Sequence, residues 1–271
     1  MSTLATTVLL AASGEGGGFH APSINDFFPQ AFLFDGTIFA FNRIMMVRVI
    51  AALAMIAIFV TVARRATLVP GRAQNVVEII LDFARVQIAE EILGKERGRR
   101  YAPMITTILV SIFFFNVTGV IPVLNIASTS LIGLPLLLAA WVMVMYLGAG
   151  IKHQGLGGFL KNSLFPPGAP WYMYFLLTPI EFLQVFLLRP GTLALRLTAN
   201  MIAGHIMLAL AFAATQFFLF EAGGALKVFS VASFAGGVMF MLFEALVAAL
   251  QAYIFALLAA VYLNLALEAE H

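Results

Sequence analysis

The chain of 271 residues contains no cysteine and few charged residues, and both shortages narrow its possible functions. Without cysteine it can form neither a disulfide nor a thiolate metal site, so thiol chemistry is excluded and the redox state of its compartment is left open. Charged residues make up 10% and hydrophobic residues 62% of the sequence, which leaves too little polar surface to coat a soluble globule. The sequence therefore predicts an integral membrane protein.

Two further patterns are missing from the sequence. The fifteen basic residues are too few and too scattered to form a phosphate-binding face, so we expect no nucleic acid partner despite the net charge of +2. The phosphate-cradling motif G-x-x-x-x-G-K-[ST] does not occur, so any nucleotide chemistry must take place in another protein. We expect no bound cofactor and no metal ion.

Apolar runs divide the chain into an amino-terminal arm and one membrane domain. Residues 1–43 are rich in glycine and proline and predict an irregular arm in water, and residues 44–271 predict a single helical membrane domain. The first expected span covers residues 44–62. Residues 64–100 hold eight of the fifteen basic residues, so this loop is expected in the cytoplasm and the amino terminus outside.

An amphipathic helix is expected after the first span. Within residues 71–93, charges at Glu78, Asp82 and Arg85 recur at steps of four and three, while apolar residues occupy other parts of the helical wheel. This pattern is typical of a helix that lies on the membrane surface, and an ordinary cytoplasmic helix is the alternative.

Residues 104–151 contain no charged residue and no histidine, which indicates membrane-spanning structure. A break near the centre of this run divides it into two antiparallel spans at residues 104–123 and 131–151. Asn116 is a polar intrusion in the first of these two spans. It either forms a hydrogen bond between helices or belongs to an ion pathway.

The carboxy-terminal part consists of two long apolar stretches, about 171–220 and 227–267, which only Glu221 and a short glycine-containing turn separate. As helices they would measure ~70 Å and ~60 Å, about twice the ~30 Å thickness of the hydrocarbon layer. Two arrangements are possible. The two stretches form a long, strongly tilted helical hairpin, or the first stretch breaks at Pro190 into two ordinary spans. We favour the tilted hairpin with a bend at Pro190, because a break would place Arg189 in an outside loop.

Of the ionisable residues in this hairpin, Arg196 costs the most free energy to place in a membrane. Its guanidinium is always charged, so it is kept in a membrane only where it meets a partner charge or lines an ion pathway. Glu181 lies too far along a straight helix to reach it, but Glu244 is a possible partner within the chain. The other interpretation is that Arg196 and Asn200, which share one helical face, point at a carboxylate of another subunit.

His205 and Glu244 are expected to form a second polar pair. An isolated histidine or glutamate would lose its charge in hydrocarbon, so two such residues on adjacent helices indicate that they satisfy each other. The pair can relay protons near neutral pH or simply hold the hairpin together, and the sequence leaves both roles open. Gln251 lies on the same helical stripe as Glu244, among alanines that permit close helix approach.

The segment L-R-L-x-x-N-M-x-A-G-H at residues 195–205 resembles the signature of subunit a of F-type ATP synthases. Other segments resemble this family in the same order along the chain. They are Pro70-Gly71 with Glu78, the run from Phe115 to Pro122, Arg189-Pro190, Phe243-Glu244, the run from Leu250 to Phe255, and Val261-Tyr262-Leu263. The resemblance covers nearly the whole chain after the amino-terminal arm.

This resemblance implies a stator subunit that lies beside a rotating c-ring and supplies two offset half-channels for protons. Arg196 would be the residue that faces the carboxylates of the ring, stabilises their deprotonated form and separates the half-channels. The candidate residues of the proton pathway are His205 and Glu244 on the entry side, Asn200 and Gln251 beside the arginine, Glu181 on the exit side, and Asn116.

The implied partners are the c-ring subunits, the peripheral-stalk subunit b, the other ATP synthase subunits and membrane lipids. The complex would couple proton transport to ATP synthesis, with the nucleotide chemistry in other subunits. We expect a bacterial plasma membrane rather than an organelle inner membrane, since the glycine-rich amino-terminal segment looks unprocessed, and we expect a cytoplasmic carboxy terminus. The alternative is a secondary transporter that binds an anion at Arg196, although such transporters usually contain an internal repeat and none is found.

Overall fold

The computed structural model describes residues 41–121, 128–165 and 171–268. The described residues are almost entirely helical and contain no β-strand. Five of their helices are long and apolar enough to cross a membrane, which confirms the expected class of all-helical membrane protein. The predicted amino-terminal arm, residues 1–43, lies outside the described residues apart from 41–43.

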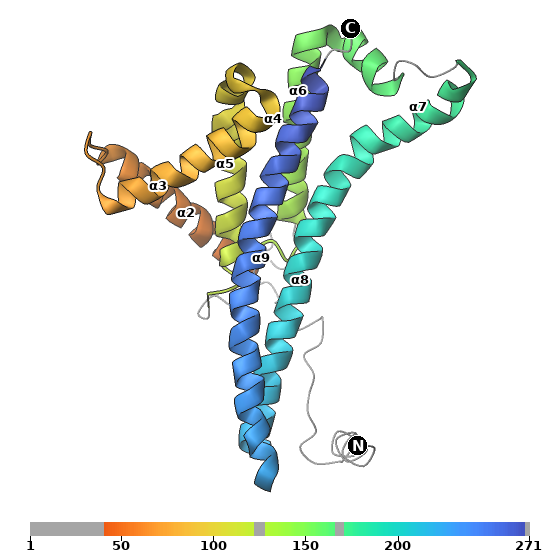
Figure 1. Cartoon of the computed structure of the whole chain (residues 1–271). Helices are drawn as coiled ribbons and strands as arrows, with labels where there is room; N and C mark the ends of the chain where they lie inside the picture. The colour runs from red at the N-terminus through yellow and green to blue at the C-terminus, as the bar shows by residue number, and fades with distance from the viewer. Residues whose placement is uncertain (1–40, 122–127, 166–170, 269–271) are drawn as a thin grey trace.

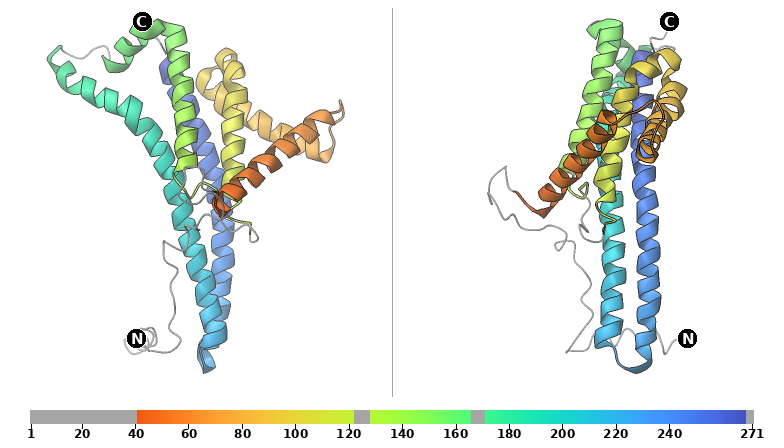
Figure 2. Two further views of the ribbon diagram at one scale, coloured as in Figure 1. Left: turned by 180° about the vertical axis from the view of Figure 1, so that it is seen from behind. Right: turned by 90° about the vertical axis from the view of Figure 1, so that its left-hand side faces the viewer.

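Four long helices, α5, α6, α8 and α9, run side by side, and α8 and α9 continue as a pair beyond the ends of the other two (Figures 1 and 2). The elements in chain order are α2 (Arg43–Arg64), α3 (Arg72–Asp82), the π-helix η2 (Phe83–Glu90), α4 (Glu91–Leu93), α5 (Lys95–Val117), α6 (Gly133–Leu164), the 3-10 helix η3 (Trp171–Met173), α7 (Tyr174–Leu183), the π-helix η4 (Gln184–Leu188), α8 (Arg189–Gln216), the π-helix η5 (Phe217–Glu221), the 3-10 helix η6 (Gly224–Lys227) and α9 (Val228–Leu267).

Two helices have ends that differ from the expected spans. α5 begins at Lys95 rather than 104 and ends at Val117 rather than 123, where the Thr118 hydroxyl donates to the Phe115 carbonyl at 2.7 Å. α6 continues past residue 151 to Leu164, with a kink at Gly155, whose φ is 75°. Hydropathy identifies the part of a helix that suits hydrocarbon, but charged residues outside that part do not stop the helix.

The first arm of the hairpin does not break at Pro190. Helical structure is continuous from Tyr174 to Glu221, and the π-helix η4 immediately precedes the proline. A π turn bonds residues five apart, so it accommodates a ring that lacks an N–H and clashes with the carbonyl four residues earlier. The Tyr146 hydroxyl donates to the Val185 carbonyl of this turn at 2.6 Å. α7 curves away from α9, whereas α8 stays against it (Figure 1).

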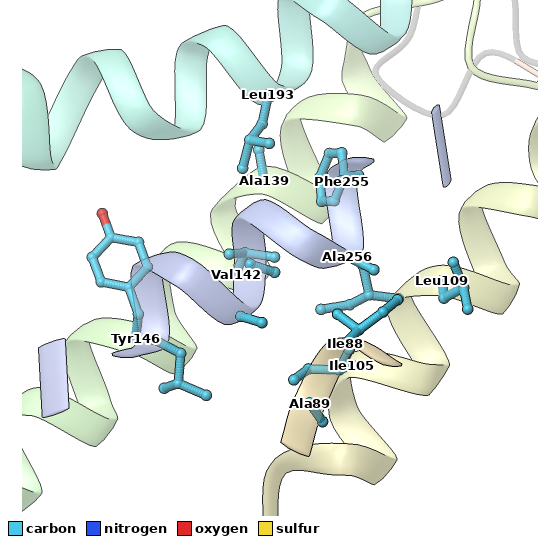
Figure 3. Close-up of a cluster of buried hydrophobic side chains, with 14 of the residues drawn as sticks. Ile88, Ala89, Ile105, Leu109, Ala139, Val142, Tyr146, Leu193, Phe255 and Ala256 are labelled. Atoms are coloured by element: carbon cyan, nitrogen blue, oxygen red, sulfur yellow. The ribbon is translucent and has the colours of Figure 1, made fainter. Parts of the chain in front are cut away.

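The core lies where α5, α6, α8 and α9 meet the inner surface of η2 (Figure 3). Small side chains on α9, such as Ala256 and Ala259, are fully buried and allow the neighbouring helices to approach closely. Larger side chains, such as Ile105, Val142 and Phe255, fill the remaining space. Close packing of this kind fixes the rotation of α8 and α9 relative to each other, and therefore which polar side chains can meet.

Arg48 connects α2 to the turn that precedes α6 through hydrogen bonds. Its guanidinium donates to the carbonyls of Ser128 at 2.8 Å and Leu131 at 3.1 Å. The sequence analysis did not single out Arg48, because its acceptors are backbone atoms about eighty residues away that no local pattern reveals. We interpret Arg48 as a structural residue, since its two hydrogen bonds to backbone carbonyls hold this turn against α2.

Candidate functional site

The two faces of α8 differ in what they contact. One face is buried against the rest of the chain and carries Leu193, Leu197, Met201 and His205 among its residues. The opposite face is exposed and carries Arg196. Its other exposed residues include Thr192, Leu195, Ala199, Asn200, Ala203 and Met207. The outward-facing surface of α8 around Arg196 is therefore mostly apolar, and Thr192 and Asn200 are its other polar side chains.

Arg196 has no partner within the described part of the chain. No hydrogen bond or ion pair joins its guanidinium to another described residue, and Glu244, the possible internal partner, contacts His205 instead. The internal salt bridge that the sequence left open is therefore not found among these residues. A permanent cation at such a position in a membrane needs either a partner charge or water beside it.

Asn200 and Gln251 connect α8 to α9 one helical turn beyond Arg196. The Asn200 side-chain amide donates to Oε1 of Gln251 at 2.9 Å. Gln251 is only 3% exposed, and its Nε2 has no hydrogen-bond partner among the described residues. A buried donor without a protein partner is normally satisfied by water, so this part of the hairpin suits a hydrated path.

His205 and Glu244 meet further along the same interface. Nδ1 of His205 lies 3.0 Å from Oε1 of Glu244, and the two residues are 5% and 4% exposed. The contact accommodates one proton, which either the ring nitrogen or the carboxyl oxygen can carry. The second carboxyl oxygen, Oε2, is buried without a partner among the described residues. This geometry confirms that the two side chains form a pair, and it leaves an acceptor available for a further proton carrier.

The Glu244 carboxylate lies close to Gly204, where a larger residue would leave no room for it. A Cβ at Gly204 would lie 2.9 Å from Oε1 of Glu244, so a Gly204→Ala variant must displace the carboxylate from His205. Because the end of a flexible side chain can move, we expect the variant to assemble but to conduct protons about tenfold more slowly. The measurement is passive proton conductance of the membrane sector in vesicles. Gly236→Ala on α9 is the control, because nothing lies within 4 Å of its added Cβ, and equal conductance in both variants would contradict the prediction.

Glu181 lies on α7, beside a small cavity that several polar side chains line. The cavity has a volume of ≈ 180 Å³, and Glu181, Arg189 and Gln154 are among its lining residues. A space of this size with polar side chains in its lining is large enough for water. The Arg189 guanidinium also lies 5.3 Å from the ring centroid of Tyr262, so it packs against α9.

Asn116 lies apart from these residues, at the end of α5. Its side-chain oxygen accepts a hydrogen bond from the Thr129 hydroxyl at 2.8 Å, and the residue is fully buried. The contact matches the first of the two roles that the sequence left open, a hydrogen bond between segments. Among the described residues no hydrogen bond joins Asn116 to His205 or Gln251, so its place in a proton pathway stays a prediction.

The candidate residues therefore follow a definite order along α7 and α8. Glu181 precedes Arg196 by ~22 Å and His205 follows it by ~13 Å, at the rise of a straight helix. A fixed cation thus separates two polar regions, each of which contains a carboxylate. Such an arrangement can carry protons at both ends but places an electrostatic barrier between them.

Comparison with known proteins identifies the family of the chain. A family model described as ATP synthase A chain matches residues 44–264. The chain is 47% identical to ATP synthase subunit a of Rhodococcus erythropolis over 99% of this chain and 96% of the relative. It is 40% identical to the subunit a of a Parafrankia species, covering 97% of this chain and 88% of that protein. The resemblance noted in the sequence is confirmed, and the chain belongs to the ATP synthase subunit a family.

Proposed function

We propose that this chain is the proton-translocating stator subunit of a rotary ATP synthase, and that Arg196 faces the carboxylates of the rotating c-ring. The observation that carries the proposal is a guanidinium on an apolar, outward-facing helix surface with no partner among the described residues. Family membership supports the setting, since the relatives are subunits of ATP synthases. A ring carboxylate supplies the missing negative charge.

Arg196 acts as an electrostatic separator in this mechanism. As a ring carboxylate approaches, the fixed positive charge favours its deprotonated form, so the carboxylate must release its proton before it passes. After passing, it leaves the influence of the cation and takes up another proton. The same charge repels protons that would otherwise cross directly between the two half-channels.

The two polar regions of the hairpin supply the half-channels. His205, Glu244 and Gln251 line the entry path on the outer side, with Asn200 beside the arginine. The cavity at Glu181 forms the exit path toward the cytoplasm. This assignment places the amino terminus outside and the carboxy terminus in the cytoplasm of a bacterial plasma membrane, as the basic residues between the first two spans indicate.

The length of the hairpin requires a strong tilt. α9 contains 40 residues, or ~60 Å of helix, about twice the hydrocarbon thickness. A tilted pair of helices presents a longer surface to the ring than an upright pair does. It also allows two offset paths to end near mid-membrane at different points of the ring.

The energy that each proton gains from the ion gradient determines how many protons must pass for each ATP. One charge that crosses 100 mV yields about 2.3 kcal/mol, so several protons must pass for each ATP formed in the nucleotide-binding subunits. The chain therefore acts with the c-ring, and we propose that it is anchored by the peripheral-stalk subunit b. A stator must be held against the torque of the ring, which explains the need for such an anchor.

Cysteine cross-linking tests which face of α8 meets the ring. The chain contains no cysteine, so a single one can be introduced at Ala199 or Ala203, both exposed on the face of Arg196. We expect each to form a disulfide with a cysteine placed beside the ring carboxylate in the assembled complex. Ala194→Cys is the control, because Ala194 is 1% exposed and faces the interior. Cross-linking from Ala194 but not from Ala199 or Ala203 would refute the proposed orientation.

A further inference from the structure

A cavity of ≈ 590 Å³ lies away from the proton pathway, between α2, η2 and α5. Its apolar wall includes Met55, Phe59 and Val60 of α2 and Pro103 and Val110 of α5. α2 leans away from α5, and α3 joins their separated ends, so the cavity lies inside the angle that these helices form (Figure 1). Because α2 and α5 are both membrane-spanning candidates, the apolar wall lies at the depth of the hydrocarbon.

The size of the cavity matches a lipid chain better than another protein helix. Arg99 and Val110 both line it, and eleven residues of helix between them span ~16 Å. This depth is about half of the ~30 Å hydrocarbon layer, which is the depth of one leaflet. A spanning helix ~30 Å long and ~10 Å wide occupies on the order of 2,000 Å³, several times the volume of the cavity.

The end of the cavity next to α3 is charged. Arg85 and Arg99 line it together with Asp82. Arg85 contacts Asp82 at 2.9 Å, while Arg85 and Arg99 share Glu90 at 3.8 and 3.4 Å. Arg99 uses only its Nε in that contact, so its terminal N–H groups can donate to another acceptor.

The start of α5 adds further positive charge near this end. Residues 95–100 contain four basic residues and one acidic residue, a net charge of +3. A guanidinium group can donate two hydrogen bonds to phosphate oxygens, and an apolar slot with two arginines and one aspartate at its rim can hold a phospholipid. The charge and the apolar depth therefore favour the same ligand.

We propose that this cavity binds one phospholipid from the leaflet next to α3. Its phosphate lies against Arg99 and Arg85, and one acyl chain extends between α2 and α5 past Phe59. The inference does not depend on the role of Arg196, because none of these residues belongs to the proton pathway. The bound lipid fills the angle between α2 and α5 and thereby holds the first span in place.

Photolabelling of the complete ATP synthase in lipid nanodiscs tests the proposal. The probe is phosphatidylglycerol with a diazirine near the middle of one acyl chain, and mass spectrometry locates the labelled residues. We expect strong labelling of residues 55–60 and 102–110. Arg85→Gln together with Arg99→Gln should lower this labelling about tenfold, since two guanidinium contacts with the phosphate are lost. Labelling of Leu137 and Val144, exposed on α6, should stay unchanged.

A cavity-filling variant provides a second measurement. Val60→Trp inserts a ring into the cavity and should lower labelling there, whereas Ile58→Trp, on the same helix but lining a different cavity, should not. The same probe with a phosphatidylcholine headgroup carries the phosphate but no net charge. If it labels the cavity as strongly as the phosphatidylglycerol probe does, the phosphate alone is recognised. If it labels the cavity more weakly, the net charge of the headgroup contributes to binding. Labelling that none of these variants changes, or that does not exceed labelling of α6, would overturn the proposal in favour of unselective lipid contact.

Discussion

Replacing Arg196 with alanine is expected to abolish ion-driven ATP synthesis, with a loss of about 100-fold or more. The variant lacks the cation that forces each ring carboxylate to release its proton, so ring rotation is no longer coupled to proton flow. Assembly should be preserved, because Arg196 is exposed and forms no hydrogen bond or ion pair with a described residue of its own chain. The measurement is ATP synthesis by inverted vesicles under an imposed gradient, together with the subunit content of the purified complex.

Two controls make the result interpretable. Leu195→Ala changes the adjacent exposed residue and should leave synthesis nearly unchanged, because it removes apolar surface but no charge. Arg196→Lys retains a positive charge but loses the planar guanidinium, so we expect partial activity at most. Coupled synthesis at the parental rate in Arg196→Ala would exclude the separator role.

The second large effect is expected at the His205 and Glu244 pair. Glu244→Gln keeps the shape of the side chain and a hydrogen bond to His205, but the amide cannot take up and release a proton at the pH of the cell. If the pair relays protons, this variant should lower passive proton conductance roughly tenfold or more. Assembly should change little, because the buried contact is retained.

Glu244→Ala and His205→Ala separate the relay role from a structural one. Each leaves a buried polar group without its partner, which usually destabilises a protein. We expect both variants to lose conductance more than they lose assembly. Normal conductance in Glu244→Gln together with poor assembly in Glu244→Ala would show that the pair only holds the hairpin together.

Much of the architecture was predictable from the sequence because the signals are local. Composition and long apolar runs predict the membrane class and the positions of the spans, and the charge steps at Glu78, Asp82 and Arg85 predict the amphipathic helix. Helix ends were less predictable. α6 runs on to Leu164, because lysine and histidine beyond Ile151 do not stop a helix.

The pairing of polar residues was only partly predictable. Helical periodicity places Arg196 and Asn200 on one face and Glu244 and Gln251 on another stripe, but it does not say which residues meet across the hairpin. The sequence left Glu244 as a possible partner of Arg196. The fold joins it to His205 instead, and joins Gln251 to Asn200.

Composition and short motifs were enough to predict the membrane class, the family and the chemical types of the candidate residues. The contacts of His205, the position of Arg48 and the cavity beside Arg99 became known only from the fold. These depend on the rotation and register of helices distant in the chain, which the packing of small residues such as Ala248 and Ala252 fixes. Arg196 is consequently left facing outward, where a carboxylate from another subunit can reach it.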